Sequence, residues 1–197
     1  MRDHQTAESQ MGRSAEDTHS AIRGLDFRLE DDIGEQFSVE PMRLADLAQV
    51  LAIERASFRS PWSKASFEAE LGKSYGGLRV VRIKGGDHIG PVLGYICFWL
   101  VADELQITNL AVHPEYRRRS IGWQLLLHAF QLGHASGAQF AVLEVGRSNK
   151  AARALYERLG FVAVHKRPRY YSESREDALV MKFNLNLKTA AGVGLQP

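Results

Sequence analysis

The sequence predicts a mixed α/β domain of the α+β kind, with a mostly antiparallel sheet of about seven strands and helices on both faces. Three strand patterns, at 78–83, 93–101 and 104–112, follow one another with short links, as in an antiparallel meander. Helical patterns then alternate with strand patterns in the second half of the chain. A chain of 197 residues, 45% of them hydrophobic, suits one medium-sized domain with a sizeable core.

The first predicted elements are a short strand at 37–39 and two helices. From Leu44 onward, apolar residues recur near helical spacing, which predicts an amphipathic helix over 45–57 with Leu44 on its apolar face. The segment 60–63, Ser-Pro-Trp-Ser, breaks this pattern, and its last serine is a suitable N-cap. A second, shorter helix is therefore expected over 64–71.

The stretch 107–122, ITNLAVHPEYRRRSIG, joins the third strand of the meander to a helix. A proline stops the strand, three arginines follow, and a helical pattern begins at Ile121; Gly133 and Gly137 mark where this helix frays and ends. A helix start has backbone N–H groups without partners and a positive dipole end. We therefore expect an anion, as part of a phosphorylated cofactor, at residues 117–122.

The last predicted elements are a strand at 140–145, a helix from Ser148 or Asn149 to about 159, and two strands at 161–166 and 178–185. Gly160 ends the helix, and a tyrosine-rich, charged loop joins the final strands. The predicted domain covers 37–187. Residues 1–36, apart from a short helix at 21–29, and residues 188–197 are expected to form a disordered extension and a flexible tail.

Composition narrows the functional classes. The single cysteine, Cys97, excludes an intrachain disulfide or a cysteine metal cluster, and the histidines lack metal-ligand spacing, so we expect no metal. No apolar stretch approaches the ~20 residues of a membrane helix, so we expect a soluble, cytoplasmic protein without a membrane partner. Residues 1–36 hold nine acids and four bases; subtracting these from totals of 23 and 25 leaves the remainder at 14 and 21, or +7. This balance fits an anionic cofactor, nucleic acid, a ribosomal surface or simple solubility.

Two motifs resemble those of the GCN5-related N-acetyltransferases (GNAT), which transfer an acetyl group from acetyl-CoA to an amine. Residues 117–122, RRRSIG, match the pyrophosphate signature Q/R-x-x-G-x-G/A at its first and last positions, with Ser120 in place of the middle glycine. Residues 143–161 resemble the family's LEV…SN…ALYxxxGF block. The order of elements also matches. The resemblance covers about 37–186 and implies a V-shaped sheet.

The RimI-type branch of this family acetylates the N-terminal alanine of a small-subunit ribosomal protein. Three segments favour it: SPWS at 60–63, RYY at 169–171 and REDA at 175–178. The resemblance thus implies acetyl-CoA as substrate and the N-terminus of a ribosomal protein as partner, with no direct nucleic-acid contact and a monomer or weak oligomer. The alternatives are a GNAT enzyme for a lysine, a polyamine or a small molecule, and a weakly catalytic CoA-binding regulator.

Glu144 is the candidate general base. Strand alternation places it on the face opposite Leu143 and Val145, where an acidic residue needs water, a partner or a site. Residues alone leave a solvated or salt-bridged glutamate open, whereas the matching RimI-type glutamate is implicated as base, directly or through water. An α-amine with a pKa near 7.7–8.0 needs only a modest base.

Tyr156 is the candidate general acid. Its helical spacing also fits a core aromatic, but the family assigns the matching hydroxyl to protonating the CoA thiolate, and a phenol with an ordinary pKa near 10 is a suitable donor. Asn149 is an N-cap, a cofactor contact, or both. Cys97 lies mid-strand with no histidine in its local pattern, which argues against a covalent acetyl-cysteine intermediate. We therefore expect direct transfer in a ternary complex.

The remaining expected contacts come from the resemblance. Main chain of one strand would pair with the pantetheine arm and polarise the thioester carbonyl, as an oxyanion hole does. The predicted cofactor contacts are Leu110, Ala111, Val112, Arg117, Arg118, Arg119, Ser120, Ile121, Gly122, Asn149 and Tyr156. The predicted acceptor contacts are Pro61, Trp62, Glu144, Tyr170 and Tyr171; the two tyrosines also fit a core-edge role.

Overall fold

The computed structural model describes residues 37–83, 90–171 and 175–186. Its elements follow the predicted order: β1 (Phe37–Pro41), a 3-10 turn η1 (Leu44–Asp46), α2 (Leu47–Ser57), α3 (Lys64–Leu71), β2 (Gly76–Ile83), β3 (Val92–Val101), β4 (Glu104–Val112), η2 (Pro114–Tyr116), α4 (Ile121–Ala135), β5 (Phe140–Gly146), α5 (Lys150–Leu159), β6 (Val162–Tyr171) and β7 (Glu176–Asn184). The predicted extension, its short helix and the predicted tail lie outside the described residues.

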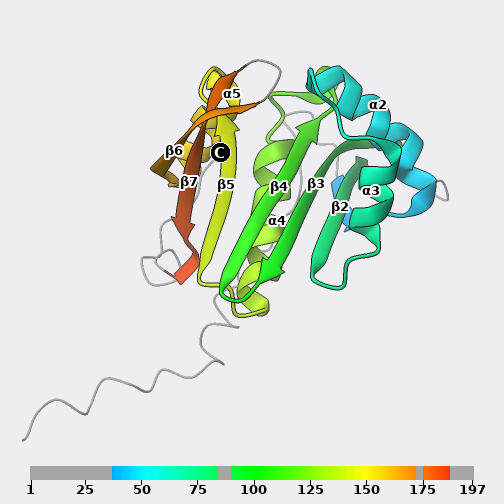
Figure 1. Cartoon of the computed structure of the whole chain (residues 1–197). Coiled ribbons are helices and arrows are strands. Elements are labelled where there is room, and N and C mark those ends of the chain that lie inside the picture. Colours follow the sequence, from blue (N-terminus) through cyan, green and yellow to red (C-terminus); the bar gives the residue numbers. More distant parts are fainter. Residues whose placement is uncertain (1–36, 84–89, 172–174, 187–197) are drawn as a thin grey trace, which may run out of the picture.

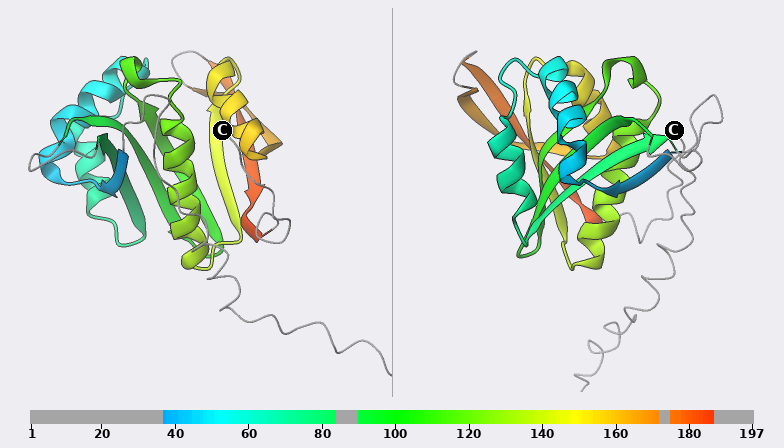
Figure 2. Two further views of the ribbon diagram at one scale, coloured as in Figure 1. Left: turned by 180° about the vertical axis from the view of Figure 1, so that it is seen from behind. Right: turned by 90° about the vertical axis from the view of Figure 1, so that its right-hand side faces the viewer.

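The seven strands form one sheet in the order β1-β2-β3-β4-β5-β7-β6. Every neighbouring pair is antiparallel except β4 and β5, which are parallel. In Figure 1, α2 and α3 lie in front of the sheet and α4 lies behind it. Figure 2 shows α4 and α5 on the rear face. The predicted meander, and the predicted mixed sheet with helices on both faces, are confirmed.

Each face of the sheet has its own apolar core. The larger core, on the side of α4 and α5, includes Leu125, Leu105 and Phe161, and the smaller one, on the side of α2 and α3, includes Ile53 and Phe67. Burying one such side chain stabilises the fold by roughly 1.5–3 kcal/mol. None of the helices in the described ranges is long and apolar enough to cross a membrane.

The helix ends that the sequence predicts are confirmed at three positions. The Ser63 hydroxyl accepts a hydrogen bond from the Ser66 N–H at 3.1 Å, which caps α3. Asn149 Oδ1 accepts one from the Ala152 N–H, also at 3.1 Å, which caps α5. Gly160 ends α5 with φ +96°, a conformation that favours glycine. Such N-caps contribute about 1 kcal/mol each.

Three local predictions are wrong. Leu44 is 67% exposed because it lies in η1, whose three-residue turn does not follow the 3.6-residue face of the next helix. Gly133 lies within α4, where a Cβ would come within 3.2 Å of the Leu105 side chain, so it serves close packing on β4. Tyr170 and Tyr171 belong to β6 and not to a loop, since an irregularity around Arg169, at φ +52°, lets the strand resume pairing with β7.

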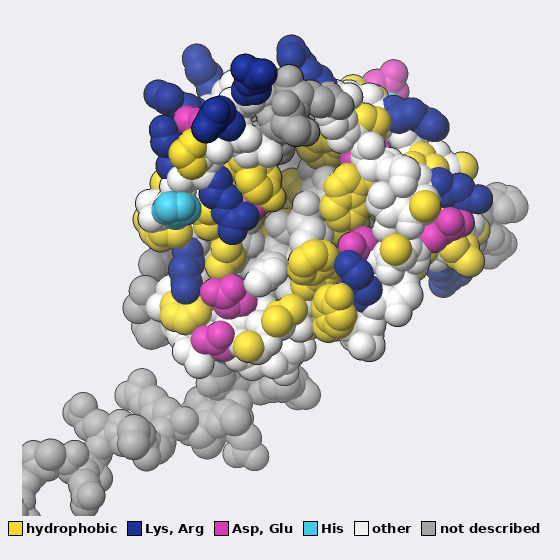
Figure 3. Space-filling model, viewed as in Figure 1, with side chains coloured by type: hydrophobic (Ala, Val, Ile, Leu, Met, Phe, Trp, Pro, Cys, Tyr) yellow, Lys and Arg dark blue, Asp and Glu magenta, His cyan; other side chains and the backbone are white. Residues whose placement is uncertain are grey.

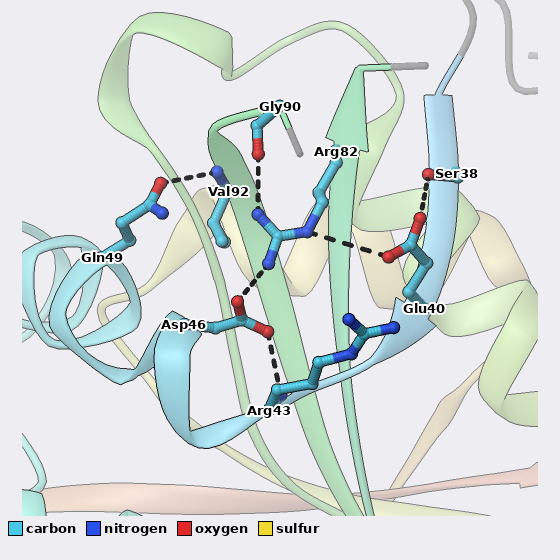
Figure 4. A network of polar contacts seen from close by, with 8 residues as sticks. All are labelled: Ser38, Glu40, Arg43, Asp46, Gln49, Arg82, Gly90 and Val92. Atoms are coloured by element: carbon cyan, nitrogen blue, oxygen red, sulfur yellow. Dashed lines mark hydrogen bonds and ion pairs between the residues drawn. The ribbon is translucent and has the colours of Figure 1, made fainter. Parts of the chain in front are cut away.

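A buried ion pair fixes the start of α2 to the sheet (Figure 4). Arg82 on β2 is 3% exposed, and its guanidinium contacts the Asp46 carboxylate and donates to the Gly90 carbonyl at 2.7 Å. Asp46, 4% exposed, also accepts the Arg43 N–H at 2.8 Å. Glu40 on β1 lies 3.9 Å from Arg82 Nε. This cluster joins β1, η1 and β2, and so sets where α2 begins.

Candidate active site

The sheet opens between β4 and β5, and this opening organises the site. Parallel pairing runs from Glu104 opposite Phe140 to Ile107 opposite Leu143 and ends there. Figure 1 shows the two strands diverging beyond this point. The predicted cofactor strand, Leu110 to Val112, therefore lies past the last β5 partner, while its other edge pairs with β3. Its β5-side backbone groups can pair with an extended ligand.

An unpaired hydroxyl lies at the vertex of this opening. Thr108 has no partner in the β3–β4 register, because Cys97 pairs with Asn109 and Phe98 with Ile107. It is therefore the bulged residue, and bulges often occur next to active sites. Thr108 Oγ1 is buried without a hydrogen-bond partner in the structure. A buried hydroxyl of this kind fits a site that receives a polar group from a ligand.

The start of α4 has the features of a phosphate-binding site. Arg118 and Ser120 have φ +68° and +56°, so the chain turns through two left-handed residues before the helix. The Ser120 side chain makes no capping hydrogen bond. The first N–H groups of the helix consequently remain available to an anion, with the positive dipole end behind them.

The helix start also packs tightly against the neighbouring elements. A Cβ added at Gly122 would meet Leu155 of α5 at 3.3 Å and Val112 of β4 at 3.7 Å. Ile121 is buried in the larger core. The candidate anion-binding site is thus held rigidly against the open edge of β4. The residues present fit a phosphorylated ligand whose acyl arm continues along β4.

The three arginines differ in what they contact. Arg117 is exposed, but its Nε donates to the Val112 carbonyl at 3.1 Å and its Nη2 donates to the Ser57 hydroxyl at 3.0 Å. It therefore links the turn to β4 and to α2. The Arg119 guanidinium lies 5.3 Å from the centre of the Tyr116 ring, and Arg118 is exposed. All three add positive charge around the helix start.

We expect Ser120→Gly to raise the free energy of unfolding by up to about 1 kcal/mol, since glycine takes a left-handed conformation without the strain that a side chain adds. The greater freedom of glycine in the unfolded chain offsets part of this gain. Acetyl-CoA affinity, measured by calorimetry, should stay equal or improve. Ser136→Gly is the matched control, because Ser136 ends the same helix at φ −92° and gains no such relief. A large loss of affinity in Ser120→Gly would make the hydroxyl a required contact.

Glu144 lies at the vertex, one residue beyond the last β4–β5 pair. Its flanking residues Leu143 and Val145 are 3% and 4% exposed, whereas the Glu144 side chain is 24% exposed, so the predicted alternation is confirmed. Its Oε1 forms an ion pair with Arg167 Nη1 of β6 at 2.7 Å. The carboxylate is therefore both accessible and salt-bridged, as the residues alone allow, and its role as the general base stays a prediction.

Tyr156 is 7% exposed, and its ring packs edge-on to Phe161 at 5.8 Å between centroids. It belongs to the larger core, as the core interpretation of this residue predicts. Its position on α5 is set by the Asn149 cap at one end and by Gly160 at the other. Burial fixes the ring, which is also what a proton donor aimed at one atom requires.

Apart from Glu144 on β5, the predicted acceptor residues come from the α2–α3 loop and from β6. Trp62, in the loop between α2 and α3, is partly buried, and its backbone N–H donates to the Glu54 carboxylate at 2.7 Å. Tyr170 of β6 is 44% exposed, with the Arg167 guanidinium 5.5 Å from its ring centre. Pro61 is exposed and Tyr171 ends β6. Figure 3, which has the same view as Figure 1, shows the molecule hollowed over the middle of the sheet.

Four further residues near the opening are missed by the motifs: Glu54, Thr108, Asn109 and Arg167. Arg167 pairs with Glu144, and Asn109 contacts Glu54. A glutamate within the apolar face of a predicted helix was a signal for Glu54, since acids are seldom buried unless they are paired. The described residues contain no cluster of His, Cys, Asp or Glu that could hold a metal ion.

Comparisons with known proteins show the family to which this fold belongs. Residues 47–161 match the model of the acetyltransferase (GNAT) family. A putative [ribosomal protein bS18]-alanine N-acetyltransferase of Bacillus subtilis is 39% identical over 150 residues, 76% of this chain and 96% of the relative. The crystal structure of the ribosomal-protein-S18-alanine N-acetyltransferase from Escherichia coli superposes with a TM-score of 0.67 at 30% identity, covering 76% of this chain and 94% of that one.

Arabidopsis thaliana NAA60, crystallised with acetyl-CoA, has the same fold, with a TM-score of 0.69 at 18% identity over 77% of this chain and 99% of that one. The family model and the relatives define an acyltransferase that acts on an amine, an N-acetyltransferase. The chain belongs to the GNAT acetyltransferase family, and within it resembles the RimI-type enzymes.

Proposed function

We propose that this protein is an acetyl-CoA-dependent Nα-acetyltransferase that modifies the N-terminal alanine of a small-subunit ribosomal protein in the cytoplasm. The observation that carries the proposal is the 39% identity, over 96% of its length, to a relative named for this activity on bS18. The 30% identical Escherichia coli structure, which is named for the same reaction, adds support.

The cofactor-binding proposal rests on the open edge of β4 and the uncapped start of α4. Acetyl-CoA supplies the activated acetyl group as a thioester. Residues 117–122 would bind its pyrophosphate, and the backbone of Leu110 to Val112 would pair with its pantetheine arm. The N–H groups on that edge would polarise the thioester carbonyl. This arrangement leaves the front of the opening, where Glu144 lies, for the acceptor.

In the proposed reaction, Glu144 takes a proton from the acceptor ammonium, directly or through a water molecule. The neutral amine then attacks the carbonyl carbon. As the amide forms and the carbon–sulfur bond breaks, the nitrogen releases its second proton to solvent, and the departing thiolate takes a proton from Tyr156. Glu144 then loses its proton to solvent and Tyr156 regains one. A covalent acetyl-cysteine route finds no support, since Cys97 is 1% exposed and burial raises the pKa of its thiol well above the ordinary value. Transfer is therefore direct, within a ternary complex.

Tyr156 is the proposed donor of the proton that the departing thiolate takes up. We expect Tyr156→Phe to lower kcat by roughly tenfold, a modest effect because a thiolate of ordinary pKa near 8.5 leaves fairly well without help. Acetyl-CoA affinity should change less than twofold, since Phe keeps the ring packing. Steady-state kinetics and calorimetry measure the two quantities. Tyr116→Phe, which removes a hydroxyl outside the proposed chemistry, is the control, and equal kcat values in both variants would remove the assigned role.

Matched peptides test the function itself. One peptide has a free N-terminal alanine and no lysine; the other is blocked at its N-terminus and carries one lysine. We expect rapid release of CoA with the first and little with the second. Preference for the lysine peptide, a polyamine or a small amine would identify another acceptor. Binding of acetyl-CoA without CoA release from any amine would instead support a regulatory role. Mass spectrometry of ribosomal N-termini, with and without the protein, then identifies the natural acceptor.

A further inference from the structure

A buried carboxylate on α2 has no part in the proposed chemistry. Glu54, in the last turn of the helix, is 1% exposed. It accepts hydrogen bonds from the Tyr95 hydroxyl of β3, from the Trp62 N–H at 2.7 Å, and from Asn109 Nδ2 of β4, which lies 3.3 Å from each carboxylate oxygen. In the described part of the chain, no lysine, arginine or histidine forms an ion pair with it.

An unneutralised carboxylate in a core carries a desolvation cost that an apolar side chain of similar size avoids, so stability alone is a weak reason for it. Its donors are arranged for the charged form. The pKa of Tyr95 is raised well above its ordinary value by burial and then by the charge of Glu54, so its hydroxyl remains a donor throughout the working pH range. Glu54 thus makes directional contacts with three different segments.

These contacts hold Trp62 from two sides. Its backbone is fixed by Glu54, and its ring packs on Phe67 of α3 at 5.4 Å between centroids. Phe67 in turn packs edge-on to Tyr95 at 5.5 Å, and Tyr95 returns to Glu54. The loop between α2 and α3 is therefore closed into a ring of contacts through this one carboxylate.

The same helical turn also reaches the cofactor side. Asn109 directly follows the bulged residue Thr108 at the sheet opening. Ser57, three residues after Glu54, accepts a hydrogen bond from Arg117 of the proposed phosphate turn. One helical turn therefore connects the Trp62 loop, the vertex of the opening and the cofactor turn.

We propose that Glu54 is the positioning residue of the acceptor site: it fixes the Trp62 loop against β3 and β4, so that this loop holds the acceptor N-terminus beside the sheet opening. The proposal rests on the proposed function. It assigns no chemical step to Glu54. It predicts that loss of the carboxylate weakens acceptor binding far more than it affects chemistry or acetyl-CoA binding.

The test variant is Glu54→Gln, which keeps the shape but cannot accept hydrogen bonds from all three donors. We expect the KM for the alanine peptide to rise about tenfold, as the loss of a charge-assisted hydrogen bond predicts. The kcat should stay within about threefold and the acetyl-CoA Kd within about twofold, because Glu54 is neither a proposed reacting group nor a predicted cofactor contact. Glu68→Gln, the same change at an exposed position of α3, should leave all three unchanged.

Amide hydrogen exchange of Trp62, followed by NMR without any acceptor, gives a direct second measurement. Exchange should be faster in Glu54→Gln and unchanged in Glu68→Gln, because only the first variant weakens the acceptor of that N–H. An unchanged KM, an unchanged Trp62 exchange rate, or equal losses in KM, kcat and Kd would overturn the positioning role. If Glu54→Gln does not fold, Tyr95→Phe replaces it. We then expect a KM rise of about threefold and faster Trp62 exchange. If the KM and the exchange rate both stay unchanged in Tyr95→Phe, the proposal is overturned.

The design separates this proposal from the function on which it rests. If the wild-type enzyme ignores the alanine peptide, the proposed function fails, and KM is then measured with the amine that the enzyme does acetylate. The Trp62 exchange rate needs no acceptor. The role of Glu54 is therefore decided either way.

Discussion

Glu144→Gln is expected to lower kcat about 100-fold at pH 7, at the lower end of the range for loss of a general base. The effect stays at that end because an α-amine with an ordinary pKa of 7.7–8.0 is already partly neutral. For the same reason, the deficit relative to the wild-type enzyme should narrow as pH rises from 7 to 9, when solvent deprotonates the amine. Acetyl-CoA affinity should change less than twofold, since Glu144 is not among the predicted cofactor contacts. Stopped-flow turnover and calorimetry measure these quantities.

The ion pair with Arg167 needs its own control. Glu144→Gln weakens a contact of 2.7 Å as well as removing a base. Arg167→Gln removes the same ion pair and leaves the carboxylate. Because the two side chains are 51% and 24% exposed, solvent screens the pair, and it should contribute less than about 1 kcal/mol. We expect Arg167→Gln to keep kcat within about threefold. Equal losses in both variants would assign the effect to the ion pair, and unchanged kcat in Glu144→Gln would exclude it as base.

The features that the sequence predicts well are those set by local chemistry. Ser63, Asn149 and Gly160 define helix ends through one side chain or one backbone angle, and each takes the predicted role. The alternation around Glu144 follows from the two-residue repeat of a strand. The order of elements, together with the motifs at 117–122 and 143–161, was enough to indicate the sheet and the family.

The features that it misses depend on distant contacts. Gly133 has the composition signal of a helix end, but the structure uses its missing side chain to bring α4 onto Leu105. The Thr108 bulge depends on the register between β3 and β4, which no local pattern contains. Glu54 and Asn109 are 55 residues apart in sequence, and only the fold brings them together. Side-chain identity therefore located the proposed reacting groups, whereas the residues that hold them needed three dimensions.

Arg82→Met is expected to destabilise the protein by about 3–5 kcal/mol, the typical cost of leaving one partner of a buried ion pair alone. Asp46, 4% exposed, would keep only the Arg43 N–H among the contacts drawn in Figure 4. Global stabilities of 5–15 kcal/mol make this a large fraction of the total. Urea denaturation, followed by tryptophan fluorescence, gives the free energy of unfolding. Glu68→Ala provides the contrast, since its pair with Lys64 is exposed and should contribute roughly 0.5 kcal/mol or less.

The double variant Arg82→Met/Asp46→Leu separates the charge from the contacts. Replacing both members of a buried pair with apolar groups is often neutral or stabilising, so most of the loss should be recovered. About 1 kcal/mol should remain, because the Arg43 N–H at the start of η1 loses its acceptor. A double variant as unstable as Arg82→Met would mean that the ion pair itself determines the position of η1 and α2. The loss in Arg82→Met would then not come only from an unpaired buried charge. In that case the KM for the alanine peptide should rise as well, because α2 carries Glu54.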